Sequence, residues 1–182
     1  MKELLRQASH LLFGVGAAAL ILILDREYAI VFFTFILFIG FLLLEIFTRG
    51  YSPPVLGTIM KWLERKRTVP AQGALAFVVG ILICIVFFPM TIAAVAVLAL
   101  GIHDSISTIV GVKYGKHRIY QKKTLEGTLA GMLATTAVLA LLIAPLLALI
   151  TAAATAVIEL YSPIDDNLVI PISICLLLWI LV

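Results

Sequence analysis

Charged residues are scarce in this sequence. Lysine, arginine, aspartate and glutamate make up 13% of its 182 residues, against about 25% in an ordinary soluble domain. Hydrophobic residues make up 63%, and the mean hydropathy is +1.20. A core of this composition could not be covered by a polar surface, which excludes an ordinary soluble domain. We therefore predict an all-α integral membrane protein, built as a polytopic helix bundle.

Cysteine is also rare. Cys84 and Cys175 are the only two in the chain, and each sits within an apolar run. Their placement excludes a disulfide framework or a cysteine metal site and predicts two small buried side chains. No polar linker or low-complexity tract divides the chain, so we expect one integral membrane domain over residues 1–182. The formal charge of +3 is modest, and no nucleic-acid partner is expected.

Apolar runs long enough to cross a bilayer follow one another along the chain. A crossing helix needs ~20 mostly apolar residues. The break before the sixth crossing is expected at Pro145, because proline removes a backbone donor and clashes with the preceding turn. A helix continuing through Pro145 would instead give six crossings. The seven predicted crossings are 4–24, 28–47, 72–88, 90–112, 127–144, 146–160 and 168–182, with a short interfacial helix over 55–63.

The basic residues predict the orientation. Lysine and arginine concentrate in cytoplasmic loops, and here they fall in residues 1–6, 49–67 and 113–123, with Arg26 alone on the other side. This pattern predicts a cytoplasmic N-terminus. Seven crossings also place the acidic loop at 162–167 in the cytoplasm. That loop has no basic residue, so the charge rule does not choose between six and seven crossings.

Acidic residues gather near the predicted helix ends. Charge within a membrane span is costly, so such residues are candidates for function. With seven crossings, all of them lie on the cytoplasmic side, together with many cations. The alternative is that charged side chains at span ends simply reach out to water. The acids concerned are Glu45, Asp104, Glu126, Glu159, Asp165 and Asp166.

The stretch 101–118 combines a small polar helix face with a basic loop. The face is predicted from helical spacing and would allow close approach of a helix or ligand. Asp104 on this face is a candidate magnesium ligand, because hard cations take carboxylate and phosphate oxygens. Glycines beside lysines in the following loop suit phosphate binding. The alternative is a packing face followed by a positive cytoplasmic loop. The face comprises Gly101, Asp104, Ser105, Thr108 and Gly111; the loop adds Lys113, Gly115 and Lys116.

Two further segments carry polar motifs. In the segment 122–127, Thr124 is predicted to cap the next helix with Glu126 in its first turn, which makes an anion site. Gly127 and Gly131 have the spacing of close helix packing. In the turn 162–168, two carboxylates and an amide could coordinate a divalent cation bound to phosphates. The alternative for that turn is a plain hydrophilic connection.

The order of these motifs resembles the polyprenol kinases. The resemblance rests on Arg6-x-x-x-His10, Asp104 with Gly111 and Gly115, Lys-Thr-Leu-Glu-Gly at 123–127, and Asp-Asp-Asn at 165–167. That family includes dolichol kinase, phytol kinase and the CTP-dependent diacylglycerol kinase, and is related to the phosphatidate cytidylyltransferases. The resemblance implies transfer of the CTP γ-phosphoryl group to a membrane-embedded lipid alcohol, giving a lipid phosphate and CDP.

The resemblance also implies roles for individual residues, with Mg²⁺ as cofactor. Glu126 is either a metal ligand or the base for the lipid hydroxyl, and His10 and Arg6 are expected to face the site. The hypothesis assigns catalysis to Asp104, Glu126 and Lys123; metal binding to Asp104, Asp165, Asp166 and Asn167; and nucleotide or phosphate binding to Gly111, Lys113, Gly115, Lys116, Lys122, Thr124 and Gly127.

Other functions stay open at this point. Cytidylyl transfer to a lipid phosphate would release pyrophosphate instead of CDP. A small ion-coupled transporter would place its acids along a path near the bilayer midplane. A structural subunit would tolerate loss of the acids. The preference for CTP over ATP comes from the resemblance alone, and the lipid alcohol and oligomeric state are not defined. Compact length and the lack of a targeting signal favour a prokaryotic cell membrane over the endoplasmic reticulum.

Overall fold

The computed structural model describes residues 2–51, 57, 72–121 and 123–182. The predicted all-α class is confirmed for this part of the chain, and each of the seven predicted segments forms a helix. The predicted interfacial helix at 55–63 lies, apart from residue 57, outside the described residues, as does Lys122. The helices are α1 (Lys2–Ile23), α2 (Arg26–Thr48), α4 (Gln72–Phe87), α5 (Met90–Tyr114), α6 (Leu125–Leu139), α7 (Pro145–Tyr161) and α8 (Asp166–Leu181).

Three of these helices are long and apolar enough to cross a membrane. They are α1 from Glu3 onward, α2 and α5, with 21, 23 and 25 residues. The other four are apolar but shorter, at 15 to 17 residues. The described part of the chain thus contains three candidate membrane spans by length and composition.

The long apolar run near the C-terminus is divided where the proline predicts. Helix α6 ends at Leu139, and Pro145 occupies the first turn of α7. Proline is well tolerated there because the amides of a first helical turn have no intrahelical partner. The division gives two helices in place of one long one, as predicted.

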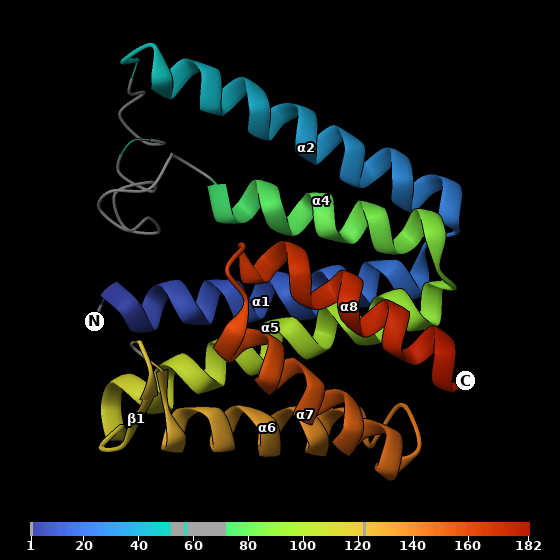
Figure 1. The fold of residues 1–182 in the computed structure, drawn as a ribbon. Coiled ribbons are helices and arrows are strands. Elements are labelled where there is room, and N and C mark those ends of the chain that lie inside the picture. Colours follow the sequence, from blue (N-terminus) through green and yellow to red (C-terminus); the bar gives the residue numbers. More distant parts are fainter. Residues whose placement is uncertain (1, 52–56, 58–71, 122) are drawn as a thin grey trace.

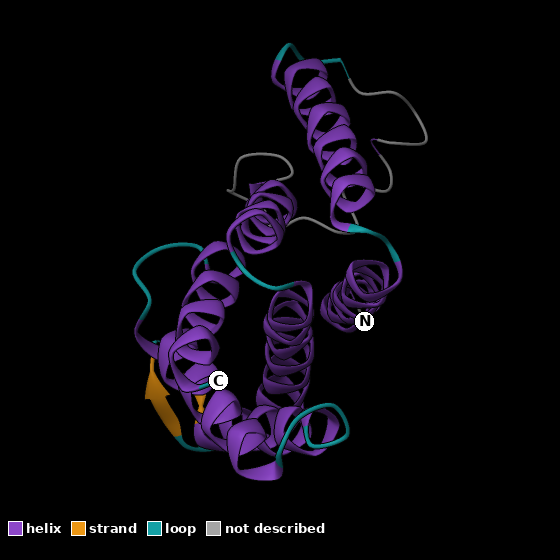
Figure 2. Ribbon diagram, turned by 90° about the vertical axis from the view of Figure 1, so that its right-hand side faces the viewer, coloured by secondary structure: helices purple, strands orange, loops and turns teal. Residues whose placement is uncertain are grey.

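Helix α5 is the centre of the bundle. It packs along α1 and α6 and also contacts α4, α7 and α8. Of its most apolar 18-residue stretch, 72% is buried inside the protein. Helix α2 lies at the edge of the bundle beside α4 (Figures 1 and 2), and only 6% of its most apolar 18-residue stretch is buried. Cys84 and Cys175 are both free and buried, as predicted.

A short hairpin and Arg26 mark two polar places in the bundle. The N-terminus and the hairpin of β1 (Arg118–Tyr120) and β2 (Lys123–Thr124) lie at the same end of the bundle in Figure 1. Arg26, the one basic residue predicted for the opposite side, donates to the carbonyl oxygens of Phe88 at 3.0 Å and Val86 at 3.4 Å. A cation at these carbonyls complements the dipole at the end of α4.

Glycines bring the α1 and α5 backbones together. A Cβ added to Gly14 would lie 2.8 Å from Cα of Gly101, and one added to Gly101 would lie 3.0 Å from Cα of Gly14. Small residues are the usual means by which apolar helices approach closely in a membrane. This contact sets the distance between α1 and the central helix.

A pair of alanine substitutions tests this contact. Gly14→Ala should lower the melting temperature in detergent, because the new methyl group meets backbone and overpacking costs about 1–3 kcal/mol. Gly16→Ala is the matched control: its Cβ would meet no described atom within 4 Å. Alanine is also favoured over glycine within a helix by ~1 kcal/mol, so the control should be neutral or stabilising. Equal melting temperatures for the two variants would contradict the contact.

Candidate functional site: a carboxylate cluster around Lys123

Glu159 near the end of α7 is a fully buried carboxylate with partners from two other elements. Ser107 Oγ donates to its Oε1 at 2.9 Å, and His103 Nε2 lies 2.9 Å from its Oε2. The ammonium of Lys123 contacts Oε1 as well. The side chains of His103 and Glu159 have no exposed surface. A buried carboxylate is tolerated only with compensation of this kind.

Lys123 joins this buried pair to the surface. It belongs to β2, and its Nζ lies 3.7 Å from Oδ2 of Asp166. Burial opposes the charge of the ammonium, but Glu159, Asp104 and Asp166 outweigh it and raise the pKa of Lys123. The side chain therefore stays protonated, in contact with Glu159 of α7, 3.7 Å from Asp166 of α8, and within electrostatic range of Asp104 of α5.

Asp166 begins α8, just before the predicted crossing at 168–182. Burial, together with the charges of Glu159, Asp104 and Asp165, raises the pKa of Asp166 to about 6 against the opposing effect of Lys123. Its neighbour Asp165 has a separate structural role as the N-cap, because its Oδ1 accepts from the backbone N–H of Asn167 at 3.1 Å. Asp166 is thus the acid of this turn that is directed to the cluster.

The side-chain amide of Asn167 has an oxygen, the buried Oδ1, that accepts no hydrogen bond from the described residues. Its Nδ2 lies 3.3 Å from the position that a Cβ on Gly73 would take. Helices α4 and α8 therefore meet at this amide, next to Asp166.

His10 brings α1 to the same cluster. Its Nε2 lies 3.5 Å from Oδ2 of Asp104, an ion-pair distance when the ring is protonated. The ring also packs at a tilt against Phe77 of α4, with centroids 5.6 Å apart. Arg6, one turn earlier, pairs with Glu3. The motif Arg6-x-x-x-His10 thus places His10 against Asp104, while the arginine is held within α1.

Glu126 lies apart from these carboxylates. It accepts from the backbone amides of Lys116 at 3.1 Å and His117 at 3.2 Å, and its Oε1 lies 2.6 Å from the His117 ring. The hydrogen bond from His117 lowers the pKa of Glu126 to about 2. A carboxylate this acidic is a weak base at neutral pH. Its evident role is to tie the loop after α5 to the start of α6.

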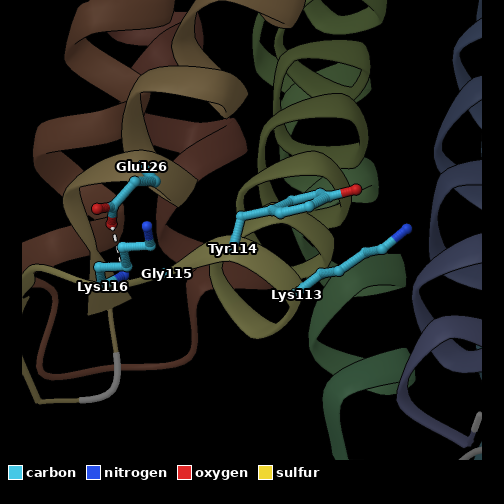
Figure 3. Close-up of a pocket in the computed structure, with 5 residues that line it drawn as sticks. All are labelled: Lys113, Tyr114, Gly115, Lys116 and Glu126. Carbon is cyan, nitrogen blue, oxygen red and sulfur yellow. Dashed lines mark hydrogen bonds between the residues drawn. The ribbon is translucent and has the colours of Figure 1, made fainter.

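The basic loop forms an open pocket beside Glu126. Figure 3 shows its lining, and its volume is about 500 Å³. The Lys113 ammonium lies 5.1 Å from the centroid of the Tyr114 ring. In Figure 3, Lys113 and Tyr114 extend to one side and Lys116 and Glu126 lie on the other, with Gly115 between them. Two of the predicted phosphate-binding lysines therefore line one open pocket.

Thr124 caps α6, as predicted. Its Oγ1 accepts from the Gly127 amide at 3.2 Å. The predicted phosphate-binding glycines pack around this hydroxyl: a Cβ on Gly111, Gly115 or Gly127 would lie 3.0, 2.8 or 3.1 Å from Oγ1. Close packing accounts for the three glycines without a ligand, which is the alternative that the sequence also allowed.

The structure brings together only some of the predicted site residues. Asp104, Lys123 and Asp166 share one cluster, which His10 and Asn167 border. His103 and Ser107 were not singled out from the sequence, and Glu159 was noted as an acid without a role. A usable signal was present, since residues four apart share a helix face and His103 and Ser107 are so spaced.

Magnesium fits this cluster only in part. No set of three or more histidine, cysteine, aspartate or glutamate side chains in the described ranges is arranged to hold a metal. Mg²⁺ is usually bound by one or two carboxylates together with substrate phosphates. Asp104 and Asp166 could supply those carboxylates, with the unused Asn167 oxygen beside them. The site would hold the ion together with a nucleotide rather than alone.

The chain has a relative along its whole length. It is 32% identical over 184 aligned positions to the uncharacterized protein MJ1137 of Methanocaldococcus jannaschii, and the alignment covers 98% of this chain and 93% of the archaeal protein. The chain belongs to the same family as MJ1137. No protein-family profile and no solved structure matches it.

The raised pKa of Asp166 in this member of the MJ1137 family predicts a pH-dependent stability. The folded protein binds this proton more tightly than the unfolded chain. Asp166 therefore contributes stability that is present below about pH 4 and is lost as the pH rises through about 6. The melting temperature of the wild type, relative to that of Asp166→Asn, should fall between pH 4 and 7. Asp25→Asn, at an exposed aspartate, is the control. A difference that stays flat with pH would contradict the prediction.

Proposed function

We propose that the protein is a lipid-alcohol kinase that transfers the γ-phosphoryl group of CTP to a membrane-embedded polyprenol or related lipid alcohol. The observation that carries the proposal is the ammonium of Lys123, held among Glu159, Asp104 and Asp166. Lys123 and Asp166 also lie in two of the four motifs on which the resemblance to polyprenol kinases rests.

The proposal includes a seven-span arrangement in a prokaryotic cell membrane with the cluster at the cytoplasmic side. Helices α7 and α8 have 17 and 16 residues, or about 24–26 Å at 1.5 Å per residue. The hydrocarbon layer is about 30 Å thick. Such short helices would keep Glu159 and Asp166 close to the membrane boundary, where a lipid hydroxyl and a soluble nucleotide can meet. MJ1137 comes from an archaeon, which supports the prokaryotic assignment.

Charge balance supports a substrate that carries a divalent cation. Three carboxylates face one ammonium, which leaves a formal charge of −2 when all four groups are ionised. Mg²⁺ held by Asp104, Asp166 and the nucleotide phosphates would offset that charge and neutralise the transferring group. Lys113 and Lys116 in the open pocket are available to the other phosphates.

Phosphoryl transfer asks mainly for positioning and charge stabilisation from a protein. The lipid oxygen forms a bond to the γ-phosphorus, the bond from that phosphorus to the bridging oxygen breaks, and CDP leaves with the electron pair. Lys123 would stabilise the negative charge of the transferring group from its fixed position. The hydroxyl proton passes to a base or to water. The acidity of Glu126 argues against that residue as the base.

The location of the acids supports a kinase over a transporter. An ion pathway would place acids along a route near the bilayer midplane. Here Asp104, Glu159 and Asp166 gather around one lysine, at helix ends in α7 and α8 and in the second half of α5. Carboxylates gathered around one lysine, with two further lysines lining an open pocket, suit an enzyme that uses a nucleotide.

Labelled nucleotides test the proposal. Purified protein in detergent is given Mg²⁺, γ-labelled CTP or ATP, and a panel of polyprenols, phytol and diacylglycerol, and the lipid phase is then extracted. Label should enter the lipid phase. Asp104→Asn and Lys123→Met should each reduce the rate at least ~100-fold, the scale of losing one group that stabilises developing charge.

Arg49→Gln is the matched control, because it removes an exposed cation paired with Glu45 far from the cluster in sequence. It should retain activity. Label entering lipid phosphate acceptors from α-labelled CTP, with release of pyrophosphate, would replace the kinase with cytidylyl transfer. No transfer to any acceptor by well-folded protein would refute both enzyme functions.

A further inference from the structure

We infer that Glu159 is a positioning residue that fixes the Lys123 ammonium for phosphate contact. This inference rests on the proposed function and deepens it. Glu159 Oε1 contacts Lys123 Nζ while also accepting from Ser107. The glutamate itself is buried and out of reach of a substrate. It can therefore act only through the lysine, whose side chain is 29% exposed.

A purely structural role explains this carboxylate poorly. Replacing a buried ion pair by packed apolar side chains is often neutral or stabilising. The other side chains that α7 buries are small and uncharged, among them Ala152, Thr155 and Ala156. Burying a charged residue costs stability. The direct effect of Glu159 is to keep Lys123 protonated and to fix the position of its ammonium.

The His103 ring lies between the second carboxylate oxygen of Glu159 and Gly131 of α6. His103 Nε2 lies 2.9 Å from Oε2, so the second carboxylate oxygen has its own neighbour. The His103 ring fits against Gly131 of α6, where a Cβ would come within 3.1 Å of Cε1. The other oxygen, Oε1, makes the contacts with Ser107 and Lys123. Through the glycine, packing of α5 against α6 places the His103 ring beside the carboxylate.

Fixing the lysine has a chemical consequence. An ε-ammonium on a flexible four-carbon chain is mobile unless it is held. Contact with Glu159 and the nearby Asp166, at 3.7 Å, restrain the Lys123 ammonium within the cluster. A pre-placed cation stabilises developing negative charge without reorganising during the reaction. Loss of Glu159 should therefore lower kcat more than it raises KM.

Kinetics of matched variants test this inference. Glu159→Gln should reduce kcat for lipid phosphorylation ~10- to 100-fold with little change in KM for the lipid. Lys123→Met should be at least as severe, and the double variant no worse than Lys123→Met, because the two residues act as a unit. Glu159→Asp, which keeps the charge, should recover part of the loss. Glu45→Gln, an exposed acid paired with Arg49, should behave as wild type.

A second measurement does not depend on kinase activity. Acylation of the Lys123 amine, followed by mass spectrometry at pH 8, should be ~5-fold faster in Glu159→Gln than in wild type, because the ammonium loses its charged partner, and unchanged in Glu45→Gln. A wild type without kinase activity would refute the proposed function while this labelling still tests the hold on Lys123. Unchanged labelling, or independent losses that multiply in the double variant, would overturn the inference.

Discussion

The need to compensate one buried carboxylate governs the polar end of this bundle. Glu159 has no exposed side-chain surface, and its partners come from α5 and from the strand that precedes α6. Satisfying it requires α5, α7 and β2 to meet at one place. The same meeting draws in Asp104 and Asp166 through Lys123. The position of the candidate site is thus a consequence of electrostatics within an apolar protein, where each charge needs a partner close by.

The helices could be predicted because apolar composition and helix-ending residues act on the local backbone. Apolar runs of sufficient length, the charges at 25–27 and the proline at 145 define helix ends without knowledge of the fold. Thr124 was equally predictable, since a threonine before a helix caps it through its own hydroxyl. The five-residue connection between α6 and α7, and the four helices of only 15–17 residues, depend on packing that the sequence does not reveal.

The site was predicted only in part, because it depends on which helix faces which. Glu126 and Glu159 look alike in sequence, both being acids near the end of an apolar run. One is bound by the loop amides and His117 at the surface, and the other is buried against His103. Likewise, the glycines at 111, 115 and 127 match a phosphate-binding pattern, yet they surround Thr124. Both distinctions are properties of tertiary packing.

The contrast between α2 and α5 bears on how such a chain can evolve. Most of α2 faces outward, so nearly any apolar residue would satisfy its surroundings, and drift along it should be rapid while its hydrophobicity is kept. Helix α5 is enclosed by five neighbours and meets α1 and α6 through backbone contacts at glycines. A substitution there must be matched by changes on several helices at once. Divergent members of the family should therefore differ most at the edge of the bundle and least along its centre.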